Sequence, residues 1–220
     1  MAQRKHIVIL AAGDFPSHPV PLHTLREADF VVCCDSAYSS LVAHHPLSLT
    51  DFVVIGDGDS LSASDKLALG NRWMQVDEQD YNDLHKAMAY ATSQFTVHNS
   101  QFTILGATGR REDHTIGNIS YLATFAEEYP NASIEMLTDY GRLCAFTGSR
   151  SFDSFPRQQV SIFSLTPQLP ISGTGLQWPL DGFCAARWWQ ATLNSALGDS
   201  FSLHSDGWLV VFQTYDPKEA

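Results

Sequence analysis

At 220 residues, of which 44% are hydrophobic and 17% charged, the chain is long enough to bury a core and has the composition of a globular protein. Its formal net charge of -11 argues against nucleic acid or an anionic membrane as the main partner. The four cysteines show no zinc-ligand spacing, and no apolar run approaches membrane-spanning length, so we expect a reducing compartment, the cytoplasm.

Strand, loop and helix repeat three times at the start of the chain. Residues 6–12, 30–34 and 52–55 are apolar runs rich in β-branched side chains, which predict strands buried on both faces of a parallel sheet. Ligands of such sheets bind beyond the carboxyl ends of the strands. Four acidic residues are expected at that edge, and each alone is also explained as a cap or turn residue: Asp14, Asp35, Asp57 and Asp59.

The sequence GDGDS at 56–60 places two carboxylates on either side of Gly58, directly after an apolar strand. Close carboxylates repel each other unless a cation or a proton lies between them. Hard oxygen ligands suit Mg²⁺, which also binds substrate phosphates. A polar turn between a strand and a helix is the alternative interpretation.

A short strand at 73–76 leads into an acidic loop, residues 77–83, and then into a predicted helix. Apolar side chains recur at helical spacing from Leu84 to Phe95. Asp80 and Asp83 are three residues apart and are expected to point the same way. Lys86, one turn into the helix, is within reach of a phosphate, although a solvated lysine explains it equally simply.

A fifth strand at 101–105 precedes the loop GATGRREDH at 106–114, and an amphipathic helix is expected after it. A glycine loop that carries arginine between a strand and a helix is suited to hold an anion. Neither the P-loop nor the dinucleotide fingerprint occurs in the chain. Asp113 has a helix N-cap as its alternative role, and His114 has no partner histidine at metal-ligand spacing.

After a sixth strand at 133–137, the character of the sequence changes. Short apolar strands separated by turn signals at 147–149, 172–175 and 206–207 predict a small all-β domain over residues 143–220. The predicted strands are 143–146, 160–165, 201–203 and 208–212. Trp178 lies between turns, where it is free to face a flat ligand.

The loops at 56–60, 78–88 and 106–114, followed by GLQWPL at 175–180, together resemble the thiamin pyrophosphokinase family. The resemblance covers nearly the whole chain in the family's order. It implies a Rossmann-like α/β domain that holds MgATP, here residues 1–140, and a C-terminal β-sandwich, here 143–220. It also implies a homodimer that binds thiamin at the subunit interface and transfers a pyrophosphoryl group from ATP to the thiamin hydroxyl.

The resemblance assigns roles to individual residues. The expected metal ligands, also catalytic, are Asp57, Asp59 and Asp80, with Asp83 and Arg110 as further catalytic residues. The expected ATP-binding residues are Asp35, Ser60, Gln79, Asn82, Lys86, Arg110, Asp113 and His114. Trp178 matches the aromatic residue that stacks on thiamin, and Asn194 falls at the family's serine-asparagine pair. The proton acceptor for the thiamin hydroxyl is expected to be either Asp83 or Asp35.

The sequence departs from the family pattern at three places. In the acidic loop, the family's TD is Asn82-Asp83 and its leading aspartate is Glu78. The family's ADGGAN is CDSAYS at 34–39, and its serine-asparagine pair is Leu193-Asn194. These changes leave open two alternatives, a Mg²⁺-dependent nucleotide phosphotransferase or hydrolase with another acceptor, and a non-catalytic thiamin or nucleotide sensor. A sensor has no need of the carboxylates in the three main loops, all of which are present.

Overall fold

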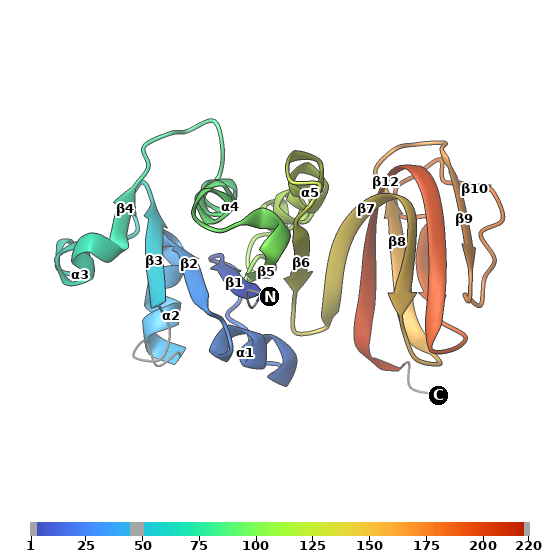
Figure 1. Ribbon diagram of the computed structural model, residues 1–220, viewed down its shortest axis with the longest axis horizontal. Helices are drawn as coiled ribbons and strands as arrows, with labels where there is room; N and C mark the ends of the chain where they lie inside the picture. Colours follow the sequence, from blue (N-terminus) through green and yellow to red (C-terminus); the bar gives the residue numbers. More distant parts are fainter. Residues whose placement is uncertain (1–3, 45–50, 218–220) are drawn as a thin grey trace. The chain divides into compact units, whose positions relative to one another are not determined.

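The computed structural model describes residues 4–44 and 51–217, which form two compact units (Figure 1). The first unit contains residues up to 121 together with 128–139, and the second contains 122–127 together with the residues from 140 onward.

The strands of the first unit are β1 (Lys5–Leu10), β2 (Phe30–Cys34), β3 (Asp51–Gly56), β4 (Trp73–Gln75), β5 (Ser100–Leu105) and β6 (Ser133–Leu137). The helices are α1 (Pro19–Arg26), α2 (Tyr38–His44), α3 (Ala63–Leu69), α4 (Asp83–Gln94) and α5 (Glu112–Glu128). Their positions confirm the six predicted strands, whereas α3 was not predicted.

The six strands pair in the order β6-β5-β1-β2-β3-β4, and every pairing is parallel. Along the chain, β2, β3 and β4 are therefore added in turn on one side of β1, and β5 and β6 then lie on the other side of β1. The β-branched runs are buried as predicted, with Ile7, Ile9 and Val32 fully enclosed. Helix α4 lies against β1, β2 and β3 and buries Leu84 and Met88 there.

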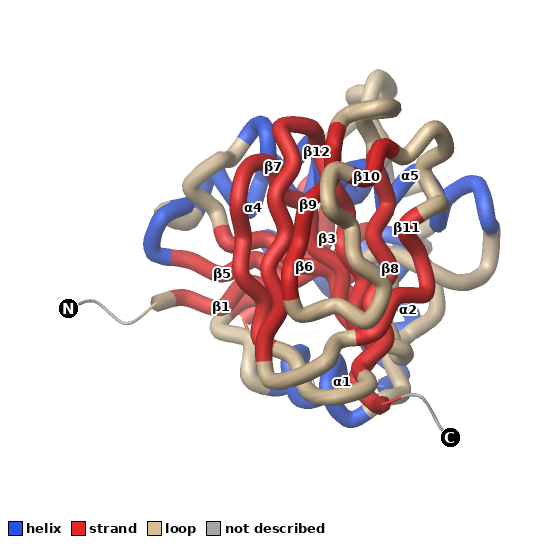
Figure 2. Tube along the Cα trace, turned by 90° about the vertical axis from the view of Figure 1, so that its right-hand side faces the viewer, coloured by secondary structure: helices blue, strands red, loops and turns tan. Residues whose placement is uncertain are grey.

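The second unit is antiparallel. Its strands are β7 (Gly141–Asp153), β8 (Gln158–Ser164), β9 (Pro170–Thr174), β10 (Phe183–Cys184), β11 (Ala191–Ser195) and β12 (Ser200–Pro217). Strand β12 pairs with β7 along both of its halves, with β9 beside its first half and β8 beside its second (Figure 2). Strand β10 pairs with β9, and β11 pairs with β8, both antiparallel.

Three predicted turns in this unit are wrong. Most of the predicted turn 172–175 belongs to β9, which ends at Thr174. Residues 147–149 lie within β7, and 206–207 lie within β12, where a register shift between Ser205 and Leu209 interrupts the ladder without ending the strand. A glycine inside a strand often marks such an irregularity. Strands β9, β10 and β11 were not predicted, because they are short and carry few apolar residues.

The parallel α/β unit followed by an antiparallel β unit confirms the predicted combination of α/β and β-rich parts. Within residues 4–44 and 51–217, none of the helices combines the length and hydrophobicity that crossing a bilayer requires.

Candidate active site

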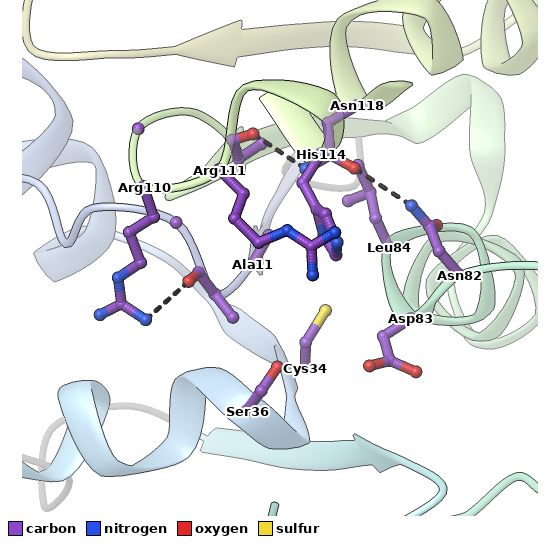
Figure 3. Close-up of a pocket in the computed structure, with 14 residues that line it drawn as sticks. Ala11, Cys34, Ser36, Asn82, Asp83, Leu84, Arg110, Arg111, His114 and Asn118 are labelled. Carbon is purple, nitrogen blue, oxygen red and sulfur yellow. Dashed lines mark hydrogen bonds between the residues drawn. The ribbon is translucent and has the colours of Figure 1, made fainter. Parts of the chain in front are cut away.

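A cavity of about 370 Å³ lies where the loops after β1, β2 and β5 meet the start of α4 (Figure 3). Strand β1 is the point at which the strand order reverses, and open parallel sheets bind their ligands at such a point. The residues that line the cavity include Gly13, Cys34, Asp83, Arg111, His114 and Asn118.

The floor of the cavity is formed by two glycine-containing loops that are hydrogen-bonded to each other. Asp14 N donates to Thr108 O at 2.8 Å, and Gly13 N donates to Gly106 O. A Cβ on Gly13 would collide with the backbone oxygens of Thr108 and Gly106, and Gly109 has φ +81°. The glycines therefore let two backbone segments approach each other at the place where an anion is expected.

The two arginines of the second loop take different directions. Arg110 has a left-handed φ of +57°, and its Nη1 donates to Ala12 O at 2.9 Å. Arg111 extends toward the middle of the cavity (Figure 3) and forms a two-point contact with Asp113, with Nη2 to Oδ2 at 2.5 Å and Nε to Oδ1 at 3.1 Å. The hydrogen bond from Arg111 lowers the pKa of Asp113.

The predicted Arg110 lines the cavity, and so does Arg111, which the sequence did not single out. No sequence signal separates two adjacent arginines, because the choice depends on the backbone conformation between them. Asp113 is the second residue of α5 and accepts from His114 N at 2.9 Å. Its predicted contact with ATP stays a prediction, while His114 is exposed and lines the cavity.

A chain of two asparagines connects the second loop to α4. Asn82 Oδ1 caps α4 by accepting from His85 N at 3.0 Å, and Asn82 Nδ2 donates to Asn118 Oδ1 at 3.1 Å. Asn118 Nδ2 in turn donates to Ala107 O at 2.8 Å. Asn118 was not predicted; its signal is a polar residue that is buried among the apolar positions of α5. Asn82 stays a predicted ATP contact. In the structure its side-chain amide links the start of α4 to Asn118 at the edge of the cavity.

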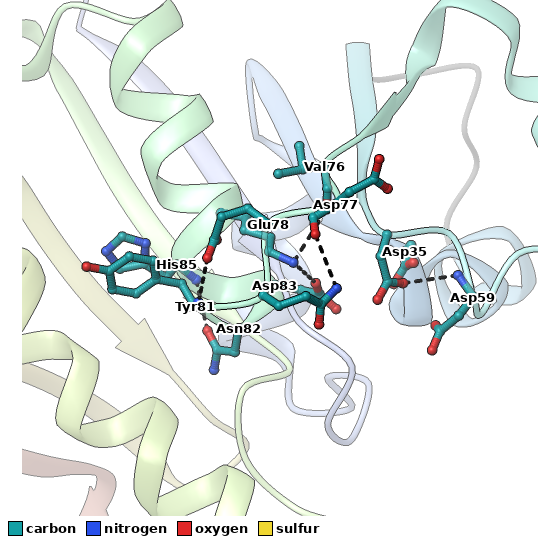
Figure 4. Close-up of polar contacts among 12 residues, drawn as sticks. Asp35, Asp59, Val76, Asp77, Glu78, Tyr81, Asn82, Asp83 and His85 are labelled. Carbon is teal, nitrogen blue, oxygen red and sulfur yellow. Dashed lines mark hydrogen bonds and ion pairs between the residues drawn. The ribbon is translucent and has the colours of Figure 1, made fainter.

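Three carboxylates meet beside the cavity, after β2 and β3. Oxygens of Asp35, Asp57 and Asp59 all lie within 4.8 Å of one another. Adjacent parallel strands end at the same edge, which is why Asp35 reaches the loop that carries the other two (Figure 4).

Asp35 is the buried member of this group, with 2% of its surface exposed. Its Oδ2 accepts from Gly58 N at 2.8 Å, whereas its Oδ1 is buried and has no hydrogen-bond partner among the described residues. Asp57 Oδ1 accepts from Asp59 N at 3.1 Å, and Ser60 Oγ donates to Asp59 Oδ1 at 2.9 Å.

The pKa shifts of the acidic residues follow from these contacts. Burial raises the pKa of Asp35, against the hydrogen bond from Gly58, and the nearby charge of Asp83 raises it further. Burial likewise raises the pKa of Asp83, although Lys86 opposes the shift. The backbone N–H of Asp59 lowers the pKa of Asp57. Three close carboxylates with one unpartnered buried oxygen fit a divalent cation, which would relieve their repulsion and use hard oxygen ligands.

Lys86 is buried, so the interpretation of this residue as a solvated lysine is wrong. Its Nζ lies 3.6 Å from Asp83 Oδ1 and 3.5 Å from Val76 O. The acidic loop itself is exposed: Gln79 Nε2 donates to Asp77 O at 3.4 Å, and Asp80 N donates to Glu78 Oε1 (Figure 4). Of the predicted metal ligands, Asp80 lies outside the group of three carboxylates found among the described residues, and its role stays a prediction.

The two residues predicted to bind thiamin lie in the second unit and differ in exposure. Trp178 has 53% of its surface exposed, whereas Asn194 has 4% exposed. The indole is therefore available to a ligand, and the asparagine is almost entirely enclosed.

The first unit is an α/β protein with glycine loops, two arginines and a carboxylate group at one sheet edge, a combination that defines the class of phosphate-binding α/β proteins. The family model described as "Thiamin pyrophosphokinase, catalytic domain" matches residues 22–135, and "Thiamin pyrophosphokinase, substrate-binding domain" matches 141–212. The chain belongs to the thiamin pyrophosphokinase family, which confirms the resemblance found in its motifs.

Among curated relatives, "Thiamine pyrophosphokinase 3" of Oryza sativa subsp. japonica is 32% identical over 142 residues, which are 59% of this chain and 52% of the relative. "Thiamine pyrophosphokinase 1" of the same organism is 30% identical over 142 residues, with the same shares. The chain thus spans about half the length of the curated relatives that it matches.

Solved structures share the fold. Thiamin pyrophosphokinase from Candida albicans superposes with a TM-score of 0.80 at 16% identity, covering 96% of this chain and 90% of the other. Thiamine pyrophosphokinase from Bacillus subtilis gives a TM-score of 0.78 at 19% identity, covering 96% and 100%.

Proposed function

We propose that this protein is a thiamin pyrophosphokinase, which transfers a pyrophosphoryl group from MgATP to the hydroxyl of thiamin and releases AMP. The observation that carries the proposal is the carboxylate group Asp35, Asp57 and Asp59 beside the glycine-arginine cavity, in a chain matched by both the catalytic and the substrate-binding family models. Carboxylates and cations placed side by side suit a triphosphate together with its metal ion.

The metal would be Mg²⁺, held by Asp57 and Asp59 together with Asp35, and the family resemblance adds Asp80. When bound, it neutralises charge on the phosphates of ATP. The unpartnered Oδ1 of Asp35 and the closeness of the three carboxylates support this assignment.

The chain's own cations would hold the phosphates. Arg111 reaches into the cavity with its direction fixed by Asp113, and the backbone N–H groups of the two glycine loops add neutral donors. Lys86 stands behind the acidic loop, where its buried ammonium offsets the surrounding carboxylates. Ser60 and Gln79, exposed near this group, keep their predicted roles as nucleotide contacts.

Two carboxylates are suited to accept the proton of the thiamin hydroxyl, namely Asp83 and Asp35. Burial raises the pKa of both, which makes each a better base than an exposed carboxylate. Asp83 lines the cavity directly, and this favours it over Asp35, whose free oxygen belongs to the metal-binding group.

We further propose that residues 1–140 form a Rossmann-like nucleotide domain and that residues 143–220 form a β-sandwich that binds thiamin. The parallel order of β1 to β6 supports the first, and the two sets of strands that share β12 support the second. The exposed indole of Trp178 would stack on the thiamin cation, a contact worth about 0.5–2 kcal/mol. The family resemblance supports a homodimer, and the cysteine usage supports the cytoplasm as its location.

The test is an assay for AMP with ATP, Mg²⁺ and thiamin, run beside a control without thiamin. Thiamin-dependent AMP is the expected result. AMP or ADP that forms without thiamin would replace the proposal by a nucleotide phosphotransferase or hydrolase with another acceptor, which a panel of alcohols would then identify. No turnover with nucleotide still bound would support a sensor.

A matched pair of variants ties the activity to the proposed site. Asp57→Asn should abolish turnover and leave the fold intact. Asp51→Asn, at the exposed opposite end of the same strand, should leave activity unchanged. Full activity of Asp57→Asn would show that the metal site has been placed wrongly.

A further inference from the structure

Trp178 lies between two buried leucines in the segment 175–180. Leu176 and Leu180 are 6% and 5% exposed and belong to the hydrophobic core of the second unit. In an extended segment Trp178 would share the face of these two leucines, yet 53% of its surface is exposed, so the indole is not held by packing into this core. Its direction therefore depends on how firmly the Trp178 backbone is fixed.

The first half of this segment is fixed by backbone pairing with residues 194–197. Leu197 N donates to Gly175 O at 2.9 Å, and Gln177 N donates to Ser195 O at 2.8 Å. These bonds form a short antiparallel ladder with an isolated bridge between them. In this register Trp178 lies opposite Asn194, at a position where a regular antiparallel ladder makes no backbone hydrogen bond.

The side chain of Asn194, and not its backbone, binds the main chain of Trp178. Trp178 N donates to Asn194 Oδ1 at 3.1 Å, and Asn194 Nδ2 donates to Trp178 O at 2.8 Å. The main chain turns away at Leu193, which has φ +61° and donates its N–H to Ser161 Oγ at 3.0 Å. The carboxamide of Asn194 thus binds both backbone polar groups of Trp178 where the strand pairing offers them no partner.

We propose that Asn194 is a positioning residue, which fixes the backbone of Trp178 so that the indole is presented to thiamin, and that Asn194 does not itself contact thiamin. Its Oδ1 also accepts from Ser195 N at 2.8 Å, and with 4% exposure it has almost no surface to offer a ligand. This inference rests on the proposed function, in which Trp178 stacks on thiamin.

A double-mutant cycle tests whether Asn194 acts through Trp178. Asn194→Ala and Trp178→Ala should each raise the thiamin KM about tenfold, because tenfold corresponds to about 1.4 kcal/mol, within the range of a cation–π contact. The ATP KM should not change. The double variant should show no larger thiamin KM than Trp178→Ala alone. Multiplying effects would overturn the proposal, since they would indicate an independent contact between Asn194 and thiamin.

Gln213→Ala is the matched control. Gln213 is another buried amide of the same unit, and its Nε2 donates to Asp153 O at 3.0 Å and to Gln158 Oε1 at 3.1 Å. Its loss should lower the melting temperature without changing the thiamin KM. A thiamin KM raised equally by Gln213→Ala would show that general destabilisation, and not positioning, explains the effect. Asn194→Asp, which keeps the two acceptor contacts, replaces the alanine variant if that protein does not fold.

Hydrogen exchange of the segment 175–180, measured by mass spectrometry without substrates, separates this inference from the proposed function. Asn194→Ala should accelerate exchange at Trp178, whereas Gln213→Ala should not. If the wild-type protein forms no AMP with thiamin, the proposed function fails, and the exchange measurement still decides whether Asn194 holds Trp178. Unchanged exchange in Asn194→Ala would overturn the positioning role.

Discussion

Replacing Asp35 with asparagine should stabilise the protein in the absence of divalent cations while it removes activity. Asp35 is buried, and its oxygens lie within 4.8 Å of carboxylate oxygens of Asp57 and Asp59. The asparagine keeps an acceptor for Gly58 N, and it presents an N–H donor in place of the unpartnered Oδ1. The variant therefore removes one of three mutually repelling charges and keeps the hydrogen bond from Gly58 N.

The separation of the charges sets the size of the effect. Two like charges about 4 Å apart repel by about 1 kcal/mol in water and by about 4 kcal/mol at an effective dielectric constant of about 20. Asp59 is exposed, which places this group nearer to the aqueous limit. We therefore expect a gain of about 1–2 kcal/mol, or about 2–8 °C in melting temperature for a chain of this size.

The gain should depend on pH. Because burial raises the pKa of Asp35, the native protein binds more protons than the unfolded chain between the unfolded value, about 3.9, and the raised native value. Wild-type stability consequently falls as pH rises through this window. The advantage of Asp35→Asn should be complete above the window and should disappear as the pH approaches about 4.

Thermal unfolding in EDTA, followed from acidic to neutral pH, measures this advantage. Asp29→Asn is the contrasting control: its carboxylate accepts from His6 N at 2.8 Å, and this bond lowers its pKa, so its loss should destabilise the protein at neutral pH. Adding Mg²⁺ should stabilise the wild type more than Asp35→Asn. A lower melting temperature for Asp35→Asn at neutral pH in EDTA would refute the view that the three carboxylates repel one another.

Three further predictions concern the cavity. Arg111→Ala should raise the ATP KM by about tenfold or more, and Arg110→Ala much less, in parallel steady-state assays; equal effects would mean that the two arginines share the phosphate contact. Gly109→Ala should destabilise the protein by about 1–3 kcal/mol in urea unfolding, because its φ is +81° and a Cβ would meet Asp14; wild-type stability would contradict the close approach of the loops. Lys86→Met should keep the fold and raise the ATP KM, and an unchanged value would assign this lysine a purely structural role.

The sheet and its loops could be predicted because strands that are buried on both faces of a parallel sheet appear in the sequence as continuous apolar runs. The β-branched runs at 30–34 and 52–55 became β2 and β3, and the acidic loops fell at their carboxyl ends. The meeting of Asp35 with Asp57 and Asp59 follows only once β2 and β3 are known to be neighbours. The sequence of a single segment does not indicate which strands will be its neighbours in the sheet.

The remaining features of the site depend on contacts between segments far apart in the chain. Asn118 and Asn82 are 36 residues apart and bond to each other through their side chains, which no local pattern indicates. The choice between Arg110 and Arg111 depends on one left-handed residue. The enclosure of Asn194 against the Trp178 backbone likewise follows from a turn at Leu193 that β-strand patterns do not predict.

The position of β12 in the chain affects how the second unit folds during protein synthesis. Its 18 residues pair with β7, β8 and β9, all of which precede it in the chain. During synthesis these three strands leave the ribosome before their common partner, with open edges of the kind that pair with other chains. The unit can close only after Ser200–Pro217 has emerged. A nascent chain that ends before this strand would therefore be prone to aggregation.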